Sequence, residues 1–325
     1  MECPICKNKE TKVIFENYPG YIEGTNFSIY QCTKCDTQFI STKKINNNIY
    51  DKIYSNKNTP GYDRYLNYAE NIKKHISPLK YLSDAEETYF PCYQFLKNKH
   101  KLEILEVGCG YGYLTYALNK AGHNTTGIDI SKNAINYAKL NFKKNYILTD
   151  LKNYNSKKKF DLIIATELIE HLKDPCEFIS TCLKKLKPKG QILLTTPNKD
   201  YYGKHIVWKT DLPPIHITWL SKNSFRYISK KYNLNHKFIK NIKYINTNHN
   251  KLADLLYSKL NILPSPILNK VGKPYTINKN IQNGRYKSIR HNIITFAPIR
   301  YTSNFIYNII KNNETAVLGI ILIKK

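Results

Sequence analysis

One stretch of the chain, residues 102–129, constrains its fold more than any other. It begins with an apolar run, Leu102–Val107, which is typical of a buried parallel strand. An amphipathic run suited to a helix follows three closely spaced glycines, Gly108, Gly110 and Gly112. A second apolar run ends near Asp129, where a carboxylate can accept hydrogen bonds from both hydroxyls of a ribose. This order of strand, glycine turn, helix and strand predicts a βαβ unit that binds a nucleoside.

The spacing of the glycines indicates which nucleoside is bound. A dinucleotide-binding turn follows the pattern G-x-G-x-x-G, whose last position is occupied here by Tyr113, and the observed spacing is G-x-G-x-G. Glu106 precedes the turn, and an acid is unfavourable beside a pyrophosphate but favourable beside a cation. Residues 106–112 (EVGCGYG) resemble the first motif of class I S-adenosylmethionine (SAM) methyltransferases. The resemblance implies that Glu106 faces the amino group of the methionine moiety and that Asp129 holds the ribose.

Later strands supply further candidates for the SAM pocket. The strand predicted at Tyr146–Thr149 ends at Asp150, and an acid there can accept a hydrogen bond from the adenine amino group. The backbone amide of Leu151 is the expected donor to the same ring. Ile130 and Thr166, at the ends of the second and fourth predicted strands, complete the predicted pocket.

Strands and helices alternate between residues 101 and 245, which indicates a parallel, doubly wound sheet. The resemblance implies an α/β fold with a Rossmann-like, seven-stranded class I methyltransferase sheet. Such sheets finish with an antiparallel hairpin, for which residues 236–245 and 316–324 are the candidates. Within the predicted core, Ser131 and Asp174-Pro175 are expected to begin helices.

The chain divides into four predicted parts. These are a zinc-ribbon module at 1–45, a helical connector or lid at 46–100, a SAM-binding core at 101–245 with 315–325, and an insertion at 246–314 near the substrate side. In the connector, helices are predicted at 64–76 and 84–90, the second stopped by Pro91. In the insertion, four leucines recur at helical spacing, which favours core packing over membrane contact: Leu252, Leu255, Leu256 and Leu260. Three clustered arginines, Arg285, Arg290 and Arg300, are interpreted as solvated surface, with a phosphate contact as the alternative.

The N-terminal module contains two C-x-x-C pairs, Cys3-Pro4-Ile5-Cys6 and Cys32-Thr33-Lys34-Cys35. Each pair can form one knuckle with two thiolates, and two knuckles complete a tetrahedral zinc site. Because four protein ligands leave no open position, the predicted zinc is structural. A redox function would require a C-x-x-C pair at the start of a helix in a thioredoxin-like unit, which the sequence lacks. The other four cysteines are predicted to be core thiols: Cys92, Cys109, Cys176 and Cys182.

Methyl transfer from a sulfonium to a hydroxyl requires alignment of the reactants, exclusion of water and removal of a proton. Glu167 and His171 follow the fourth predicted strand, at the edge of the sheet where ligands gather. A histidine titrates near neutral pH, so His171 is the first candidate for the base, and His216 is the second. The alternative for His171 is that it caps or packs the following helix.

The resemblance extends beyond the glycine turn. The order of the zinc module, GIDIS, ATELIEHLKDP, LKPKGQILLTTPN and PPIHITWLSKNS is similar to bacterial zinc-module methyltransferases of sugar and polysaccharide pathways. The core motifs are also similar to the O-methyltransferases of ubiquinone biosynthesis. Sugar C-methyltransferases usually carry a glycine motif with Asn-Asp, which is absent here. The resemblance therefore implies O-methylation of a small molecule, such as a nucleotide-activated sugar or a glycan.

The net charge of +27 introduces a second hypothesis, an rRNA or tRNA methyltransferase that holds RNA with its zinc module and lysines. Only five of the 51 basic residues are arginines, the preferred contacts for phosphates and guanine. The lysine excess, with abundant Asn, Ile and Tyr, is typical of AT-rich coding, so nucleic acid is the less favoured partner.

A non-catalytic SAM-binding scaffold is the third hypothesis. No apolar run reaches membrane-span length and no signal core is seen, so a cytoplasmic location is expected, and the sequence does not indicate an oligomeric state.

Overall fold

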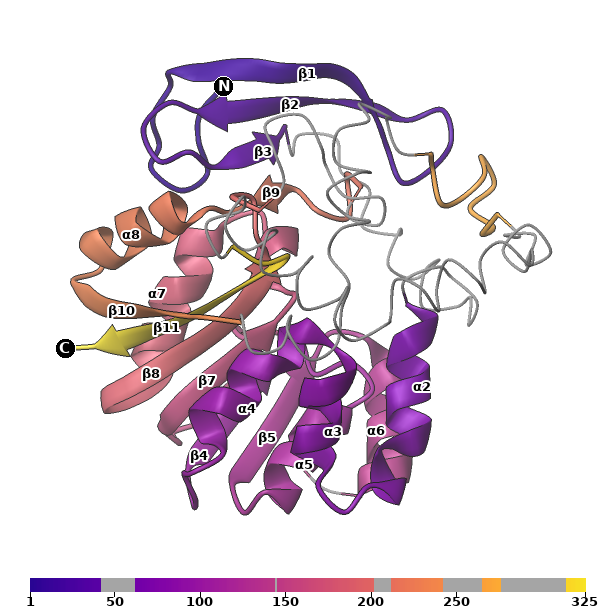
Figure 1. The fold of residues 1–325 in the computed structure, drawn as a ribbon, viewed down its shortest axis with the longest axis vertical. Helices are drawn as coiled ribbons and strands as arrows, with labels where there is room; N and C mark the ends of the chain where they lie inside the picture. Colours follow the sequence, from indigo (N-terminus) through magenta and orange to yellow (C-terminus); the bar gives the residue numbers. More distant parts are fainter. Residues whose placement is uncertain (42–61, 144, 202–211, 242–264, 276–313) are drawn as a thin grey trace, which may run out of the picture.

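The computed structural model describes residues 1–41, 62–143, 145–201, 212–241, 265–275 and 314–325 (Figure 1). Its central sheet has seven strands in the order β10-β11-β8-β7-β4-β5-β6. Neighbours from β8 to β6 are parallel, whereas β11 is antiparallel to both β8 and β10. The strands are β4 (Glu103–Val107), β5 (Asn124–Asp129), β6 (Tyr146–Leu148), β7 (Phe160–Thr166), β8 (Leu186–Pro197), β10 (Leu234–Ile239) and β11 (Val317–Lys324). The predicted fold class, including the antiparallel hairpin at the edge of the sheet, is confirmed.

Successive apolar residues of the strands face opposite sides of the sheet, as the period of a strand requires. Ile104 packs in a buried cluster with α2, α3, α4 and α5, whereas Leu105 packs in a second cluster with α7 and α8. The helices are α2 (Asp63–Asn71), α3 (Pro78–Ala85), α4 (Phe90–Leu96), α5 (Tyr113–Lys120), α6 (Lys132–Phe142), α7 (Pro175–Lys185) and α8 (Lys222–Lys231). Much of the predicted connector thus covers one face of the sheet.

Capping side chains lie at the N-termini of two helices, as the sequence predicts. Ser131 accepts a hydrogen bond from the backbone N–H of Ala134, and Asp174 accepts one from Glu177. The predicted helix at 84–90 is wrong, because α3 ends at Ala85 and Pro91 lies in the first turn of α4. Proline lacks a backbone N–H, but first-turn N–H groups have no intrahelical partner, so proline is tolerated there.

The segment Lys187-Pro188-Lys189-Gly190 has a composition typical of a turn, but it lies within β8. Pairing between β7 and β8 is irregular between Phe160 and Leu162, and Lys189 has a positive φ of 58°. The extra residues are therefore accommodated as an irregularity in a continuous strand. This arrangement makes β8 a strand of 12 residues at the centre of the sheet.

A second, antiparallel sheet has the order β1-β2-β3-β9 and lies across one end of the core, next to α8 (Figure 1). It combines β1 (Thr11–Pro19), β2 (Asn26–Cys32) and β3 (Gln38–Ile40) with β9 (Thr218–Trp219), which comes from the core segment. Of the predicted insertion, residues 265–275 pack on this sheet, where Leu268 bridges to Ile22. The leucines and arginines singled out between 252 and 300 lie outside the described residues. Among the helices in the described ranges, none is long and apolar enough to cross a membrane.

Candidate functional site

A cavity of about 560 Å³ opens at the C-terminal ends of β4, β5, β6 and β7. Strand ends converge at this edge because the four strands are parallel. All predicted cofactor and catalytic residues except Gly112 line it: Glu106, Gly108, Gly110, Asp129, Ile130, Asp150, Leu151, Thr166, Glu167, His171 and His216. The fold thus brings residues from five separate segments to one cavity.

The glycines of the turn have different roles. Gly110 has a φ of +49°, and no atom lies within 4 Å of the position that a Cβ would occupy, so its backbone is open to a ligand. A Cβ on Gly108 would lie 3.2 Å from a methyl group of Leu168. Gly112 does not line the cavity, and a Cβ there would lie 2.5 Å from the ring of Tyr146. Gly112 therefore permits the packing of α5 against β6.

Two carboxylates, a buried one and a half-buried one, stand at the ends of adjacent strands. Glu106 is 2% exposed and accepts a hydrogen bond from Thr115 Oγ1. Burial, with a smaller contribution from the charge of Asp129, raises the pKa of Glu106 to about 8. Asp129 accepts from the backbone N–H groups of Gly110 at 2.8 Å and Ser131 at 2.7 Å, although burial raises its pKa. A cationic ligand would relieve the cost of keeping these acids ionised in the cavity.

Asp150 and Ile130 line the cavity on the side of Glu106 and Asp129. Asp150 accepts from the backbone and side-chain N–H groups of Asn153, which fixes the orientation of its carboxylate. Ile130 is 72% exposed although it is a large aliphatic residue, and it lies on the rim of the cavity beside Asp129. A flat ring placed against Ile130 would remove this apolar surface from water.

Glu167 lines the other half of the cavity, which contains the candidate catalytic residues. It has a positive φ of 49°, a conformation that is rare for residues other than glycine and is often found at functional sites. Its Oε1 accepts a hydrogen bond from Thr88 Oγ1 at 2.9 Å, and the Thr88 hydroxyl also contacts that of Thr195 at 2.7 Å. These contacts set the direction of the Glu167 carboxylate.

The two candidate histidines lie together. Their rings meet edge to face, with centroids 4.5 Å apart. His171 Nδ1 is 2.8 Å from the carbonyl oxygen of Ile215, which can only accept, so Nδ1 carries the proton and Nε2 is the basic nitrogen of the neutral ring. Burial lowers the pKa of His216 to about 3, so His216 remains neutral at physiological pH and is a poor base.

Several residues that the sequence analysis did not single out also line the cavity, and four of them come from the connector. One of these, Arg64, forms an ion pair with Glu86, with 3.0 Å between Nε and Oε1. Tyrosines from the connector and from the residues around Gly112 line the same cavity: Tyr62, Tyr65, Tyr89, Tyr111 and Tyr113. The abundance of tyrosine in this part of the chain was visible in the sequence, but no spacing indicated that the rings would share a cavity.

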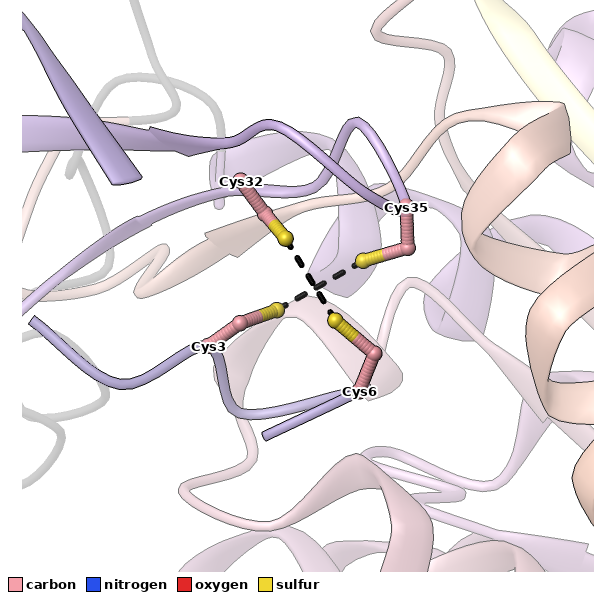
Figure 2. A group of neighbouring side chains, drawn as sticks. All are labelled: Cys3, Cys6, Cys32 and Cys35. Carbon is pink, nitrogen blue, oxygen red and sulfur yellow. Dashed lines mark hydrogen bonds between the residues drawn. The ribbon is translucent and has the colours of Figure 1, made fainter. Parts of the chain in front are cut away.

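The four predicted zinc ligands converge at one point between β2, β3 and the N-terminus (Figure 2). Cys3 Sγ lies 3.5 Å from Cys35 Sγ, and Cys6 Sγ lies 3.4 Å from Cys32 Sγ. All four sulfurs are within 4.8 Å of one another. Sulfurs bonded tetrahedrally to zinc at about 2.3 Å lie about 3.8 Å apart, so the donor set and its geometry fit zinc.

The two knuckles have the same backbone hydrogen bonds. Lys7 N–H donates to the Cys3 carbonyl, and Asp36 N–H donates to the Cys32 carbonyl. Lys7 and Asp36, which each follow the second cysteine of a pair, have φ values of 59° and 61°. Because hydrogen bonds between the thiols couple them, the pKa of Cys35 is lowered while that of Cys3 is raised. The other four cysteines are buried, as predicted.

Comparison with known proteins agrees with the prediction of a methyltransferase domain. Residues 81–236 match the family described as "Methyltransferase domain". The chain is 35% identical to a ubiquinone biosynthesis O-methyltransferase of Rickettsia akari, over 40% of this chain and 54% of that protein. It is 34% identical to the protein of the same name from Hydrogenovibrio crunogenus, over 33% of this chain and 49% of that protein. The chain thus spans about half the length of these curated relatives.

A similar solved structure is that of the plantazolicin methyltransferase BpumL in complex with SAH. The identity is 20%, the alignment covers 86% of this chain and 96% of that chain, and the TM-score is 0.44.

The match to the methyltransferase-domain family, residues 81–236, lies within the core and the end of the connector. It therefore covers the cavity-forming strands and leaves out the cysteine module.

Proposed function

We propose that this protein is a SAM-dependent methyltransferase that methylates a hydroxyl oxygen of a small molecule. The observation that carries the proposal is a pair of acids, the buried Glu106 and the half-buried Asp129, which line the same cavity as the open backbone of Gly110. The methyltransferase-domain match over residues 81–236 supports the same activity. The curated relatives are O-methyltransferases by name, which supports oxygen as the acceptor atom.

In the proposed complex, Glu106 binds the amino group of the methionine moiety and Asp129 binds the ribose hydroxyls. Ile130 and Leu151 contact the adenine ring, and Asp150 accepts from its amino group. The backbone around Gly108 and Gly110 lies against the ligand because neither residue has a side chain. The sulfonium is then directed toward the half of the cavity that contains Glu167 and His171, since both halves belong to one cavity.

The reaction is an in-line displacement at the methyl carbon. A lone pair of the acceptor oxygen forms the new C–O bond, and the electrons of the S–C bond return to sulfur, which leaves S-adenosylhomocysteine (SAH). The hydroxyl proton passes to His171 Nε2, whose lone pair is assigned by the Nδ1 hydrogen bond to Ile215. Glu167 accepts hydrogen bonds from the acceptor, and His216 packs against His171 and keeps its ring in place.

The acceptor half of the cavity supports a ring-shaped acceptor. Tyrosine rings at Tyr62, Tyr65 and Tyr89 provide flat apolar surfaces, and the guanidinium of Arg64, which is paired with Glu86, lines the same cavity. These contacts suit a nucleotide-activated sugar, whose ring packs on tyrosine and whose phosphates approach arginine. A phenolic ring, as in the biosynthesis of ubiquinone, is the alternative that the experiment below distinguishes.

We further propose that Cys3, Cys6, Cys32 and Cys35 hold a structural zinc ion. The knuckles pack directly on the core, where Thr37 Oγ1 lies 2.8 Å from Ser224 Oγ and Cys176 Sγ donates to the carbonyl of Ile5. Elemental analysis is expected to find one zinc per chain, lost in Cys6→Ser. The Tm of that variant should fall by about 5–10 °C, since about 1 kcal/mol shifts Tm by about 2–4 °C in a chain of this size. Full zinc content in Cys6→Ser would contradict the assignment.

The acceptor is identified by incubating the full chain with methyl-labelled SAM and separate cell fractions of RNA, nucleotide sugars, polysaccharide, lipid and soluble phenols. Label is expected in the nucleotide-sugar fraction, with the Asp129→Ala variant as background. Label in the phenol fraction would support SAM-dependent O-methylation but would show that the acceptor is a phenol and not a nucleotide sugar. Label confined to RNA, together with RNA binding that weakens steeply with salt, would overturn the small-molecule proposal. Tight SAH binding without label in any fraction would leave a non-catalytic SAM-binding protein.

A further inference from the structure

The short strand β9 connects the small sheet to the wall of the cavity. It pairs with β3, where Phe39 lies opposite Thr218, although β3 belongs to the N-terminal module and β9 to the core segment. The pairing extends one residue further, because the backbone N–H of Ile40 donates to the carbonyl of Ile217 at 3.1 Å. Figure 1 shows β9 between β3 and the core, at the end of the core that the module covers.

The segment that leads into β9 has a second hydrogen bond to the module, near its other end. The backbone N–H of Tyr21 donates to the carbonyl of Pro213 at 2.7 Å. Between the two bonded positions, Ile215 and Ile217 are 1% and 2% exposed, and they pack in a buried cluster with Tyr21 and Ile40. Backbone bonds and apolar packing therefore both hold this segment against the module.

The same segment orients the two histidines of the cavity. His171 Nδ1 donates to the carbonyl of Ile215 at 2.8 Å, and the ring of His216 contacts the ring of His171 edge to face. Ile217 has backbone bonds on both sides, because its carbonyl accepts from β3 and its N–H donates to the carbonyl of Glu170 at 3.0 Å. A continuous path of backbone hydrogen bonds thus leads from β3 to the turn that carries His171.

The second cysteine knuckle and helix α8 fix the start of β3. The backbone N–H of Cys32 donates to the carbonyl of Thr37 at 2.9 Å, which closes the loop between β2 and β3. Thr37 Oγ1 lies 3.1 Å from Cys35 Sγ and 2.8 Å from Ser224 Oγ on α8. Because β3 is bonded to the knuckle, to the core and to β2, it is a more rigid support than a loop.

We propose that β3 is a positioning element for the acceptor half of the cavity, in which Ile40 keeps His171 in place through the backbone of Ile215–Ile217. None of the described residues of the module, 1–41, lines the cavity, so the module acts through the segment that ends at β9. The effect on catalysis rests on the proposed function. A displacement of about 1 Å at a reacting group can cost about 100-fold in rate, so a small shift of this segment lowers turnover.

The test compares two substitutions of Ile40 in the full chain. Ile40→Pro removes the N–H that bonds to Ile217, whereas Ile40→Ala shortens the side chain and keeps the N–H. Leu96→Ala is the control for a lost buried side chain, because Leu96 is 1% exposed and packs on the other face of the sheet.

Transfer of label from methyl-labelled SAM to the accepting cell fraction should fall at least about 10-fold in Ile40→Pro and less in Ile40→Ala. Leu96→Ala should stay within about threefold of the unsubstituted protein, and so should the SAH affinity of all three variants. Calorimetry with SAH measures that affinity and shows which variants retain the folded cavity.

A magnetic resonance measurement on the ring of His171 separates positioning from a general loss of stability. With ¹⁵N-labelled histidine, the Nδ1–H group that donates to Ile215 gives a protected proton signal, which is assigned by its absence in His171→Gln. Leu96→Ala should keep this signal, whereas exchange with water should weaken it in Ile40→Pro. If Ile40→Pro does not bind SAH, Ile40→Ala is compared with Leu96→Ala in its place.

A folded Ile40→Pro variant with unchanged turnover and an unchanged His171 signal would overturn the proposal, as would equal losses in Ile40→Ala and Leu96→Ala. Loss of the signal in Ile40→Pro, when the unsubstituted protein methylates no fraction, would support the positioning and refute the proposed function. Methyl transfer that does not depend on Ile40 would do the reverse.

Discussion

The two halves of the cavity differ in how the chain builds them. The half that faces Glu106 and Asp129 is formed within residues 106–151, from strand ends that follow one another in the sequence. The half around His171 combines the turn after β7 with the connector and the segment that ends at β9. Because the residues of the first half follow one another in the sequence, a sequence motif predicts that half. The second half forms only when distant segments pack together.

The two halves also differ in charge. Two acids, Glu106 and Asp129, dominate the first half, and their raised pKa values indicate that a cation would stabilise their ionised forms. The second half mixes an arginine, two histidines and Glu167, which suits proton transfer and a polar acceptor. If this division is correct, substitutions in one half should change SAM binding, and substitutions in the other should change turnover.

The largest effect is expected for His171→Gln. Because His171 is the proposed base, its loss should lower turnover by about 10²–10⁴-fold, the usual contribution of general acid–base catalysis. SAH affinity should change by less than about threefold, or about 0.6 kcal/mol, because His171 belongs to the acceptor half and is not assigned a contact with the cofactor. Steady-state kinetics and calorimetry together measure the contrast. Turnover near that of the unsubstituted enzyme would remove His171 from the mechanism.

Asp129→Ala should give the opposite pattern. Loss of two hydrogen bonds between a carboxylate and the ribose hydroxyls is expected to weaken SAH binding at least about 100-fold, since bonds to charged groups contribute about 1.5–3 kcal/mol each. The N–H groups of Gly110 and Ser131 bind different oxygens of Asp129, so Asp129→Asn keeps the size of the side chain and one of the two acceptors and is the nearest control for the shape of the turn. Calorimetry that finds equal SAH affinity in Asp129→Ala and the unsubstituted protein would remove the ribose assignment.

A smaller effect should appear in the pH dependence of stability. The pKa of Glu106 is about 8 in the folded, ligand-free protein and near its ordinary value of 4.5 when unfolded. Between these values the folded state holds a proton that the unfolded state has lost. This contribution to stability is therefore complete below about pH 4.5 and is lost as the pH rises through about 8.

The Tm of the ligand-free protein should therefore fall from pH 5 to pH 8, and Glu106→Gln should reduce that fall because glutamine does not titrate. Thermal melts of both proteins at several pH values measure the difference. The SAM amino group favours ionised Glu106, so SAM should also bind more tightly as the pH approaches 8. Parallel Tm profiles for the two proteins would show that Glu106 is ionised in the empty cavity.

Local signals in the sequence predicted much of the first half of the cavity. The glycine spacing, Glu106 and Asp129 all lie where the βαβ pattern places them, because neighbouring parallel strands end at a common edge. The helix starts at Ser131 and Asp174 were predicted correctly, since a capping side chain bonds within its own turn. Predictions from local chemistry failed at Pro91, where the same residue can end one helix or begin the next.

Tertiary structure decided the remainder. The edge-to-face contact of His171 with His216 joins residues from separate segments, and the bond from His171 to Ile215 selects the basic nitrogen. Arg64 likewise lines the cavity only because α2 packs beside the sheet.

The amino-acid sequence by itself determined the strand–turn–helix unit and the two cysteine knuckles, because their interactions are local or repeat at a fixed spacing. Only folding decided which distant side chains face the acceptor, because long-range packing has no signature in residue spacing.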